Sequence, residues 1–283
     1  MIFVRLTNGF GNNLFQYIAG RLLAEHHKKE LVLIPPFKDY YGLNEIIKLG
    51  LKFDAIENQI DLSGCELITE KNYLLAYKNN HNQTDLVLEG YFEDYIYYYD
   101  HLKKIRTWFP FSAKRENNDL VLHLRTGDRL FYKAHYKSNG EPILDGTRIV
   151  KAINQIEFEK LFIVSDLPKF EKVDMNEFKQ YQFHVNVSHK DSIDYNWALQ
   201  YHNSLIDIFS KYDPIFKKRE ISADFSFIRS FNNILFQHST LAWWAAVLSD
   251  AKSVGVYGPW RPYKNYNNKN LSKVPLKGWY QWE

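Results

Sequence analysis

Histidine, arginine and aspartate occur close together in His123-Leu-Arg-Thr-Gly-Asp128, at the end of the apolar run Leu120–Leu124. Successive side chains of a strand point to opposite faces, so His123 and Arg125 share one face. The planar guanidinium of Arg125 can donate two parallel hydrogen bonds to a phosphate and stays charged. These residues predict a site for an anionic ligand. The structural alternative is an Arg125–Asp128 ion pair that closes a turn.

The second candidate is the glycine-containing turn Asn8-Gly-Phe-Gly-Asn12, which follows the strand-like run Ile2–Leu6 and precedes a helical pattern. Backbone N–H groups and the helix dipole meet at such a turn and can bind an anion. Gly9 and Gly11 permit unusual backbone angles and the close approach of a ligand. Position 14 is Leu, so the stretch is not the Gly-x-Gly-x-x-Gly fingerprint. By itself it is better explained as a tight turn.

Two hydroxyl residues, Ser239 and Thr240, follow the short apolar run Ile234–Phe236 and begin a helical pattern. Hydroxyl groups and free amides at the start of a helix bind phosphate oxygens well. The alternative is ordinary helix capping. For the neighbouring Trp243 and Trp244, packing between helix and sheet is the better explanation.

The elements that must position these residues are short strands that alternate with helices along the chain. Expected strands are Ile2–Leu6, Leu31–Ile34, Leu86–Leu88, Leu120–Leu124, Leu161–Val164, Ile234–Phe236 and Ser253–Tyr257. Expected helices are Leu14–His27, Tyr95–Trp108, Thr147–Ile156 and Thr240–Leu248. Several strands are almost continuous apolar runs, which is typical of parallel sheets covered on both faces. The alternation predicts a doubly wound α/β architecture.

The length of 283 residues predicts two domains, at about one domain per 150 residues. A polar stretch at Pro110–Asn118 separates an expected helix from an expected strand. We therefore expect Rossmann-like lobes at residues 1–115 and 116–283, with a cleft between them. The aromatic, helical-looking segment Ser188–Arg219 does not follow the alternation, and is either an insertion on the substrate side or additional scaffold.

Composition excludes several classes of protein. The net charge of +3 is too small for a nucleic-acid-binding protein. Cys65 is the only cysteine, which rules out an intrachain disulfide and favours a core residue in a reducing compartment. No apolar run approaches about 18 residues and the start does not resemble a signal peptide, so we expect a cytoplasmic protein. The four lysines between Lys264 and Lys277 allow peripheral contact with an anionic membrane, although a solvated tail is simpler.

Taken together and in this order, the three motifs resemble the α-1,2-fucosyltransferase family. Gly9 to Tyr17 is similar to the family's opening Gly-Gly-Leu-Gly-Asn-Gln-Met/Leu-Phe-Gln-Tyr-Ala stretch. The family's His-x-Arg-Arg-Gly-Asp motif is matched by His123, Arg125, Gly127 and Asp128. Its Asn-Ser-Thr/Ser-Phe-Ser-Trp-Trp-Gly-Ala motif is matched by Ser239, Thr240, Trp243 and Trp244. Two further blocks agree, Glu89-Gly-Tyr-Phe-Glu-Asp-Tyr95 and Ile163-Val-Ser-Asp166. The departures are Glu93, Asp94, Thr126, Leu167, His238 and Ala242.

The resemblance implies a GT-B fold and an inverting glycosyltransferase that transfers fucose from GDP-fucose to a galactoside-like hydroxyl of a glycan. The first lobe would then face the acceptor and the second would hold the nucleotide sugar. Arg125 is expected to stabilise the departing diphosphate. Assistance would come from Ser239, Thr240 and the backbone around Gly9, Gly11 and Asn12. His123 is expected to orient the nucleotide, and Asp166 either contacts it or has a structural role.

Chemistry also needs a base for the acceptor hydroxyl, and Asp128, Glu89 and Asp94 all lie near motifs. An Asp128 held by Arg125 would have a depressed pKa and would be a weak base. No cofactor is expected. Protein cations can replace a metal, and no Asp-x-Asp occurs in the sequence.

Three alternatives stay open. The donor can be another nucleotide sugar, or the chain can be a catalytically degraded glycan- or nucleotide-binding protein, for which the departures at Thr126, His238 and Ala242 are the motivation. An oxidoreductase that binds a dinucleotide is disfavoured. The third glycine of the dinucleotide-binding fingerprint is absent from this chain. In addition, Leu31–Ile34 is followed by two prolines instead of an acidic residue.

Overall fold

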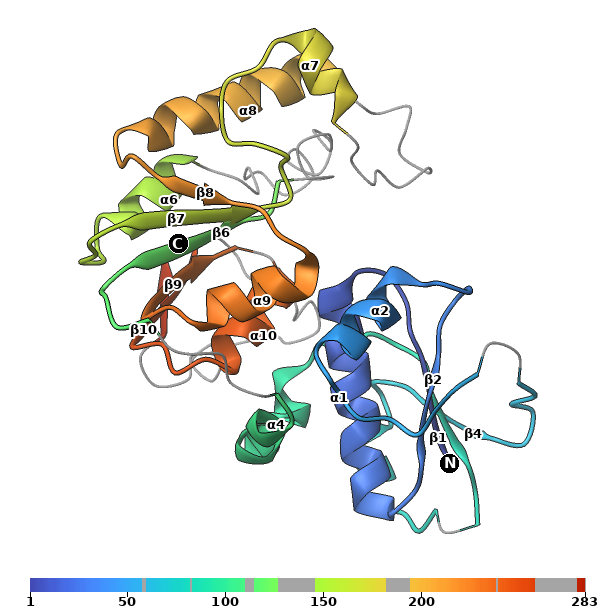
Figure 1. The fold of residues 1–283 in the computed structure, drawn as a ribbon. Helices are drawn as coiled ribbons and strands as arrows, with labels where there is room; N and C mark the ends of the chain where they lie inside the picture. The colour runs from blue at the N-terminus through green and yellow to red at the C-terminus, as the bar shows by residue number, and fades with distance from the viewer. Residues whose placement is uncertain are drawn as a thin grey trace. The chain divides into compact units, whose positions relative to one another are not determined.

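The apolar runs of the sequence form the strands of two separate parallel sheets (Figure 1). The computed structural model describes residues 1–57, 60–81, 83–109, 115–126, 146–181, 194–237, 239–257 and 279–282. Unit 1 contains the described residues up to Phe109, and unit 2 contains those from Arg115 onward. The chain is therefore an α/β protein, and the expected boundary after residue 115 lies close to this division.

Unit 1 is built on a five-stranded sheet in the order β3-β2-β1-β5-β4. Its strands are β1 (Ile2–Arg5), β2 (Leu31–Ile34), β3 (Ala55–Ile56), β4 (Glu66–Ile68) and β5 (Leu86–Leu88). Phe3 on the central strand pairs with Val32 on β2 and with Val87 on β5, and all pairings are parallel. Later strands lie on both sides of β1, so the connections reverse direction beside it. Such a switch point is where ligands commonly bind to open α/β sheets.

The helices of unit 1 are α1 (Phe10–His27), α2 (Tyr41–Lys48), α3 (Tyr73–Ala76), η1 (Tyr95–Tyr97), η2 (Tyr99–His101) and α4 (Leu102–Trp108). The long α1 is buried along most of its length and contacts β1 and β2. The cluster of Phe3, Val32 and Val87 packs instead against Ile60, Leu62 and Cys65. Cys65 is only partly buried, so it lies at the margin of this core and not inside it, and this partial burial raises the pKa of its thiol.

The single helix expected at Tyr95–Trp108 was a wrong prediction, because the segment consists of two short 3₁₀ helices followed by α4. Its tyrosines explain the interruption. Tyr95, Tyr97 and Tyr98 are all buried, although consecutive residues on an α-helix cannot all face one core. The hydroxyl of Tyr98 also donates a hydrogen bond to the carbonyl of Phe92, 2.5 Å away.

Unit 2 contains a six-stranded parallel sheet in the order β11-β10-β9-β6-β7-β8. The strands are β6 (Leu120–Leu124), β7 (Leu161–Ser165), β8 (Ile215–Lys217), β9 (Asn233–Phe236), β10 (Ser253–Tyr257) and β11 (Trp279–Trp282). Counted along the chain within this unit, the order is 3-2-1-4-5-6 when read from β8, as in Rossmann folds. The switch point lies between β6 and β9, where His123 pairs with Phe236.

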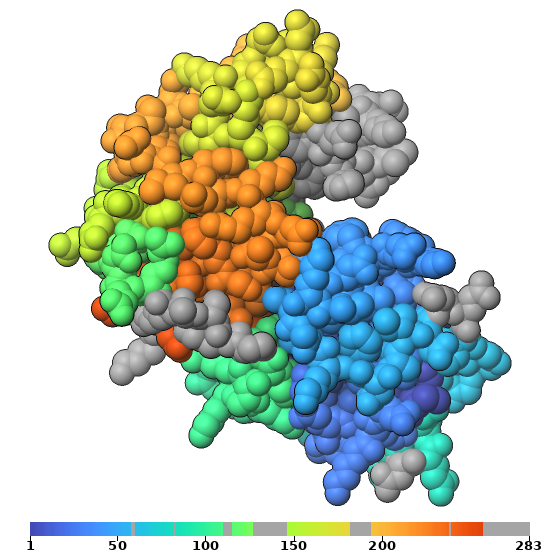
Figure 2. Space-filling model, in the orientation of Figure 1, coloured from blue at the N-terminus to red at the C-terminus, as the bar shows by residue number. Residues whose placement is uncertain are grey.

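Helices cover both faces of this sheet (Figure 1). They are α6 (Gly146–Ile153), α7 (Met175–Gln180), α8 (Tyr195–Ser210), α9 (Ile221–Arg229) and α10 (Thr240–Val247). Leucines of β6 share one core cluster with α6, α7 and α8. On the other face, Phe162 of β7 contacts the rings of Phe227 and Phe231. Figure 2 shows the orange atoms of α8 and α9 as a continuous outer surface of unit 2.

The described part of Ser188–Arg219 belongs to the scaffold of unit 2. It supplies α8, whose Ala198, Leu205 and Phe209 are fully buried in the core, and the strand β8. Of the two expectations for this segment, additional scaffold is therefore correct for residues 194–219.

No helix among the described residues is long and apolar enough to cross a membrane. The lysine-containing stretch 264–277 lies outside the described residues.

Candidate functional site

The carboxyl ends of four adjacent strands in unit 2 bring together residues that are far apart in the sequence. Leu124 of β6 pairs with Ser165 of β7, and Val164 of β7 pairs with Lys217 of β8. On the other side, His123 pairs with Phe236 of β9. Arg125, Asp166 and Lys218 follow directly after the paired positions of β6, β7 and β8, and Ser239 stands three positions after Phe236. The predicted residues of the middle and late motifs therefore lie at one edge of the same sheet, beside its switch point.

A hydrogen-bond network joins the ends of β6 and β7. The carboxylate of Asp166 accepts hydrogen bonds from the backbone N–H of Thr126, at 3.0 Å, and from its hydroxyl, at 2.8 Å. The Thr126 hydroxyl also lies 2.7 Å from that of Ser165. Asp166 thus holds Thr126, the second residue after β6, in place. Thr126 is fully buried. The arginine that the α-1,2-fucosyltransferases have at this position would therefore not make the same hydrogen bonds.

His123 is a buried histidine with an unsatisfied ring nitrogen. Its side chain is only 9% exposed, and among the described residues Nδ1 has no hydrogen-bond partner. Burial lowers the pKa of His123 to about 4; nearby Asp166 opposes this effect, and nearby Arg125 adds to it. The imidazole is therefore neutral at physiological pH. A buried polar atom without a partner is uncommon, and Nδ1 is a position that a bound ligand can satisfy.

Ser239 and Thr240 start α10 at the switch point, as expected. The Ser239 hydroxyl accepts a hydrogen bond from the backbone N–H of Ala242, at 3.2 Å, and its carbonyl accepts one from Trp243. Ser239 is therefore the N-cap, and Thr240 is the first helical residue and half-buried. Both the capping explanation and an anion site remain compatible with this geometry, because a capped helix still presents its positive end. Trp243 and Trp244 are buried, as the packing explanation requires.

The structure adds two cations that the sequence analysis missed. The ammonium of Lys218 donates a hydrogen bond to the backbone carbonyl of Asp166, 3.4 Å away. The guanidinium of Arg219 stacks on the ring of Phe227 at 3.7 Å. Both residues follow β8, a short strand that ends in a lysine and is only partly buried, so its three residues do not form a buried apolar run. The run Lys-Lys-Arg after Ile215-Phe216 was the available signal.

Asp224, in the first turn of α9, is a third residue that the motifs did not reveal. Burial raises its pKa to about 7, against the opposing effects of the Arg219 backbone and charge. Its Oδ1 atom has no hydrogen-bond partner among the described residues and lies 3.9 Å from Nη1 of Arg219. Such a carboxyl group can hold or release a proton near neutral pH.

The glycine-containing turn of unit 1 differs from expectation in its backbone. The residue with positive φ is Asn8, at 61°, whereas Gly9 has an ordinary φ of −81° and Gly11 lies inside α1. The expectation of unusual backbone angles at these two glycines was therefore wrong. Asn can adopt the left-handed conformation, which explains how a non-glycine residue makes this turn. Asn12 follows Gly11 within the same helix.

Two buried side chains of α1 hold that turn. The amide of Gln16 donates to the Thr7 hydroxyl and to the carbonyl of Gly90, both at 2.8 Å, and its oxygen accepts from the Thr7 backbone. Asn13 donates to the Thr7 carbonyl at 2.9 Å. These amides connect α1 to the ends of β1 and β5. Their positions in the opening motif thus have a structural explanation.

The exposed rim around this turn carries an ion pair and aromatic hydroxyls. Arg5 forms an ion pair with Glu89, and the hydroxyl of Tyr41 donates to the carbonyl of Asn8 at 2.9 Å. The exposed Tyr91 contacts the Asn8 amide. Paired charges, amides and rings of this kind suit the hydroxyls and apolar faces of a sugar better than they suit a diphosphate.

The candidates for the general base have different surroundings. Asp94 accepts a hydrogen bond from the backbone N–H of Ile96 and caps η1, so its role in the fold is structural. Glu89 pairs with Arg5 at a strand end. Asp128 lies outside the described residues, as do Gly127 and His238.

The residues that the structure describes contain no group of three or more His, Cys, Asp or Glu side chains placed to hold a metal ion. Comparison with known proteins finds neither a protein-family model nor a curated protein sequence that matches the chain.

Proposed function

We propose that this protein is an inverting glycosyltransferase of the GT-B type that transfers fucose from GDP-fucose to a hydroxyl of a galactoside-like acceptor. The observation that carries the proposal is the switch point of unit 2. There the cation Arg125, the unsatisfied Nδ1 of the neutral His123 and the start of α10 lie at one edge of a Rossmann-like sheet. Their motifs are the ones that resemble the α-1,2-fucosyltransferases.

In this reaction the bond between C1 of fucose and the diphosphate breaks, and a bond between C1 and the acceptor oxygen forms. Negative charge grows on the leaving diphosphate, and Arg125 would stabilise it by charge-assisted hydrogen bonds. Lys218 lies beside Asp166 at the same edge and would add positive potential. The acceptor proton passes to a base, and GDP leaves as the second product.

The rim of unit 1 supports an acceptor-side role for that unit. Its Arg5–Glu89 pair, the amide of Asn8 and the ring of Tyr91 offer both hydrogen-bonding groups and a flat surface. Because Glu89 already pairs with Arg5, the cation of this rim is not available to a diphosphate, so we assign the rim to a neutral sugar and the diphosphate to unit 2. The contribution of Gly9, Gly11 and Asn12 to donor binding stays a prediction.

The deciding experiment incubates purified protein with GDP-fucose and a panel of galactosides and measures released GDP. Release that depends on the galactoside, together with a fucosylated product, supports the transferase. The Arg125→Ala variant should lose turnover, and Arg106→Ala, which alters an exposed arginine of α4, should keep it. Absence of GDP release with every acceptor would refute a fucosyltransferase with these substrates.

A second candidate is a nucleotide-binding protein without transferase activity. The buried Thr126, bonded to Asp166 where the resembled family has an arginine, specifically favours this candidate, because one expected cation is missing. In that case GDP should raise the melting temperature without any turnover, since a ligand of the folded state stabilises it by mass action.

A further inference from the structure

A cavity of about 630 Å³ lies in unit 1, away from the rim described above. It is formed by the last turns of α1, the end of α2 and the connections that lead into β2 and β3. Since the strands are parallel, residues that precede β2 and β3 lie at the amino-terminal edge of the sheet. The turn at Gly9 follows β1 and lies at the opposite, carboxyl-terminal edge. The cavity is therefore separate from the surface assigned to the acceptor.

The lining combines an apolar wall with an excess of positive charge. Ile47, Leu51 and Phe53 provide the wall, and Ile47 is 49% exposed. Four cationic and two acidic residues also line the cavity, and these six residues are Arg21, Lys28, Lys29, Lys52, Glu25 and Asp54. A cavity of this size is within the range of small-molecule sites, which is about 300 to 1,000 Å³.

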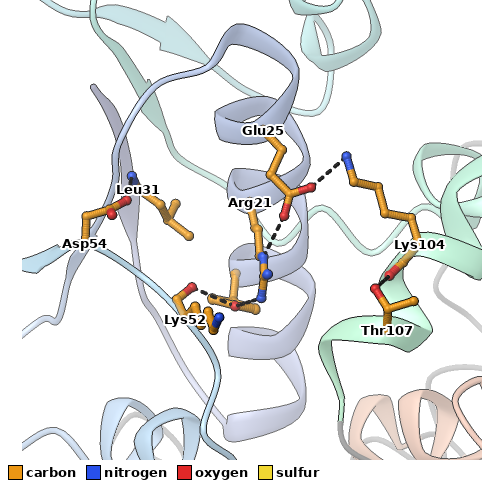
Figure 3. A network of polar contacts seen from close by, with 8 residues as sticks. Arg21, Glu25, Leu31, Lys52, Asp54, Lys104 and Thr107 are labelled. Carbon is orange, nitrogen blue, oxygen red and sulfur yellow. Dashed lines mark hydrogen bonds and ion pairs between the residues drawn. The ribbon is translucent and has the colours of Figure 1, made fainter.

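The carboxylate of Glu25 is already satisfied by protein cations. It accepts from Nε of Arg21 at 3.0 Å and from Nζ of Lys104 at 2.6 Å, as Figure 3 shows. Burial raises its pKa, but the hydrogen bonds from Lys104 and Arg21 outweigh this and lower it, so Glu25 stays ionised. Arg21 is held further by the ring of Trp108, 4.2 Å from its guanidinium carbon.

The Tyr17 hydroxyl, which contacts Arg21, does not offset the positive charge of the arginine. Burial raises its pKa to about 12, so it stays neutral. It accepts a hydrogen bond from Arg21 at 2.8 Å and donates one to the backbone carbonyl of Lys52 at 2.9 Å. The connection that contains Lys52 is thereby fixed against α1.

Two lysines at the cavity form no ion pair with a carboxylate of the described residues. Neither Lys28 nor Lys52 forms an ion pair with another residue of the described chain, whereas Lys29 is bound to Asp85 and to the carbonyl of Thr84. Asp54 accepts the backbone N–H of Leu31 at 2.7 Å. Two ammonium groups that line one cavity and have no ion-pair partner among the described residues suit a doubly charged anion better than a singly charged one.

We propose that this cavity binds a small organic phosphate, with the phosphate between Lys28 and Lys52 and an apolar body against Ile47, Leu51 and Phe53. The site would bind a ligand other than the substrates of the transferase, and it does not depend on that function being correct.

Phenyl phosphate is a suitable probe, because it has a dianionic head and an apolar ring but no sugar or guanine. Titration calorimetry should give a Kd below about 1 mM, and benzyl alcohol, which lacks the charge, should bind at least about tenfold more weakly. The double variant Lys28→Gln/Lys52→Gln should weaken phenyl phosphate about tenfold. The matched control Lys71→Gln/Lys78→Gln alters two exposed lysines of the same unit outside the cavity and should leave the affinity unchanged.

Three results would overturn the proposal. One is a Kd above about 1 mM. Another is equal affinity of the two double variants, which would mean non-specific attraction to positive charge. The third is loss of binding in Arg125→Ala, which would place the probe in unit 2. The altered lysines are exposed, so the variants should fold, and circular dichroism checks this directly.

Discussion

Among the described histidines of unit 2, His123 should contribute more to the pH dependence of stability than His202 does. In the unfolded chain its pKa is near 6.5, and burial lowers it to about 4 in the folded protein. Above pH 6.5 neither state binds the proton, so the histidine adds no pH dependence there. As the pH falls below 6.5, the unfolded state takes the proton and the folded state does not. Acid therefore favours unfolding, until the folded state is also protonated below about pH 4.

Linkage turns this difference into a free energy. With pKa values of 6.5 and about 4, acidification from about pH 7.5 to about pH 5 lowers the free energy of unfolding by about 2 kcal/mol through this one residue. The nearby carboxylate of Asp166 reduces the effect and the guanidinium of Arg125 increases it. His202, on the other face of the sheet, also has a pKa lowered by burial and acts in the same direction.

The assay is urea unfolding at several pH values between about 7.5 and 5, followed by tryptophan fluorescence. Wild type should lose about 2 kcal/mol more than His123→Gln over this range, since glutamine keeps polar atoms but cannot titrate. Thr126→Val is the control, because it destabilises the same strand end and keeps the histidine. Its curve should run parallel to that of wild type. Parallel curves for wild type and His123→Gln would refute the reasoning, and would mean that the imidazole is hydrated in the folded state.

Four further outcomes are expected. Arg125→Ala should lower GDP release about 100-fold or more without changing the melting temperature, because it removes charge stabilisation in the transition state; unchanged turnover would make Arg125 a structural residue. EDTA should leave the transferase reaction unchanged, and loss that manganese restores would contradict a mechanism based on protein cations. Thr126→Val should lower the free energy of unfolding by about 1 to 3 kcal/mol, because it leaves part of the buried Asp166 network without a donor; urea unfolding measures this. Gly90→Ala should cost about 1 to 3 kcal/mol, since Gly90 has φ of 149° and a Cβ would lie 2.5 Å from the Glu70 carboxylate. Gly50→Ala, with φ of 67° and open space around it, should cost less in the same measurement.

Much of the fold could be predicted from local pattern. The strands at Leu31–Ile34, Leu86–Leu88, Leu120–Leu124 and Ser253–Tyr257 have the expected bounds. Each is a run of mainly apolar residues, which is the pattern expected of a strand whose two faces are both covered. The N-cap at Ser239 was equally local, because the hydroxyl and the amide that it satisfies are three residues apart.

Where long-range packing decided the conformation, the sequence was a poor guide. Tyr95, Tyr97 and Tyr98 are all buried, although one face of an α-helix cannot carry all three. Their burial therefore interrupts the helix that the spacing suggested. Strands β3, β4 and β8 have only two or three residues each. Unlike β5, whose three residues are all apolar and buried, these strands contain partly or fully exposed residues, so no apolar run marks them in the sequence. Each becomes a strand because a neighbouring strand supplies its hydrogen-bond partners.

For the candidate site, the sequence by itself determined which residue types stand at the ends of strands and the starts of helices. Only the tertiary structure decided that β6 lies between β7 and β9, so that Arg125, Asp166 and Ser239 meet at one edge. It also decided that Asp166 is bound by Thr126 and that His123 is buried and neutral. Hydrogen-bond partners and desolvation both depend on strand order, which comes from contacts between distant parts of the chain and leaves no local signal in the residues involved.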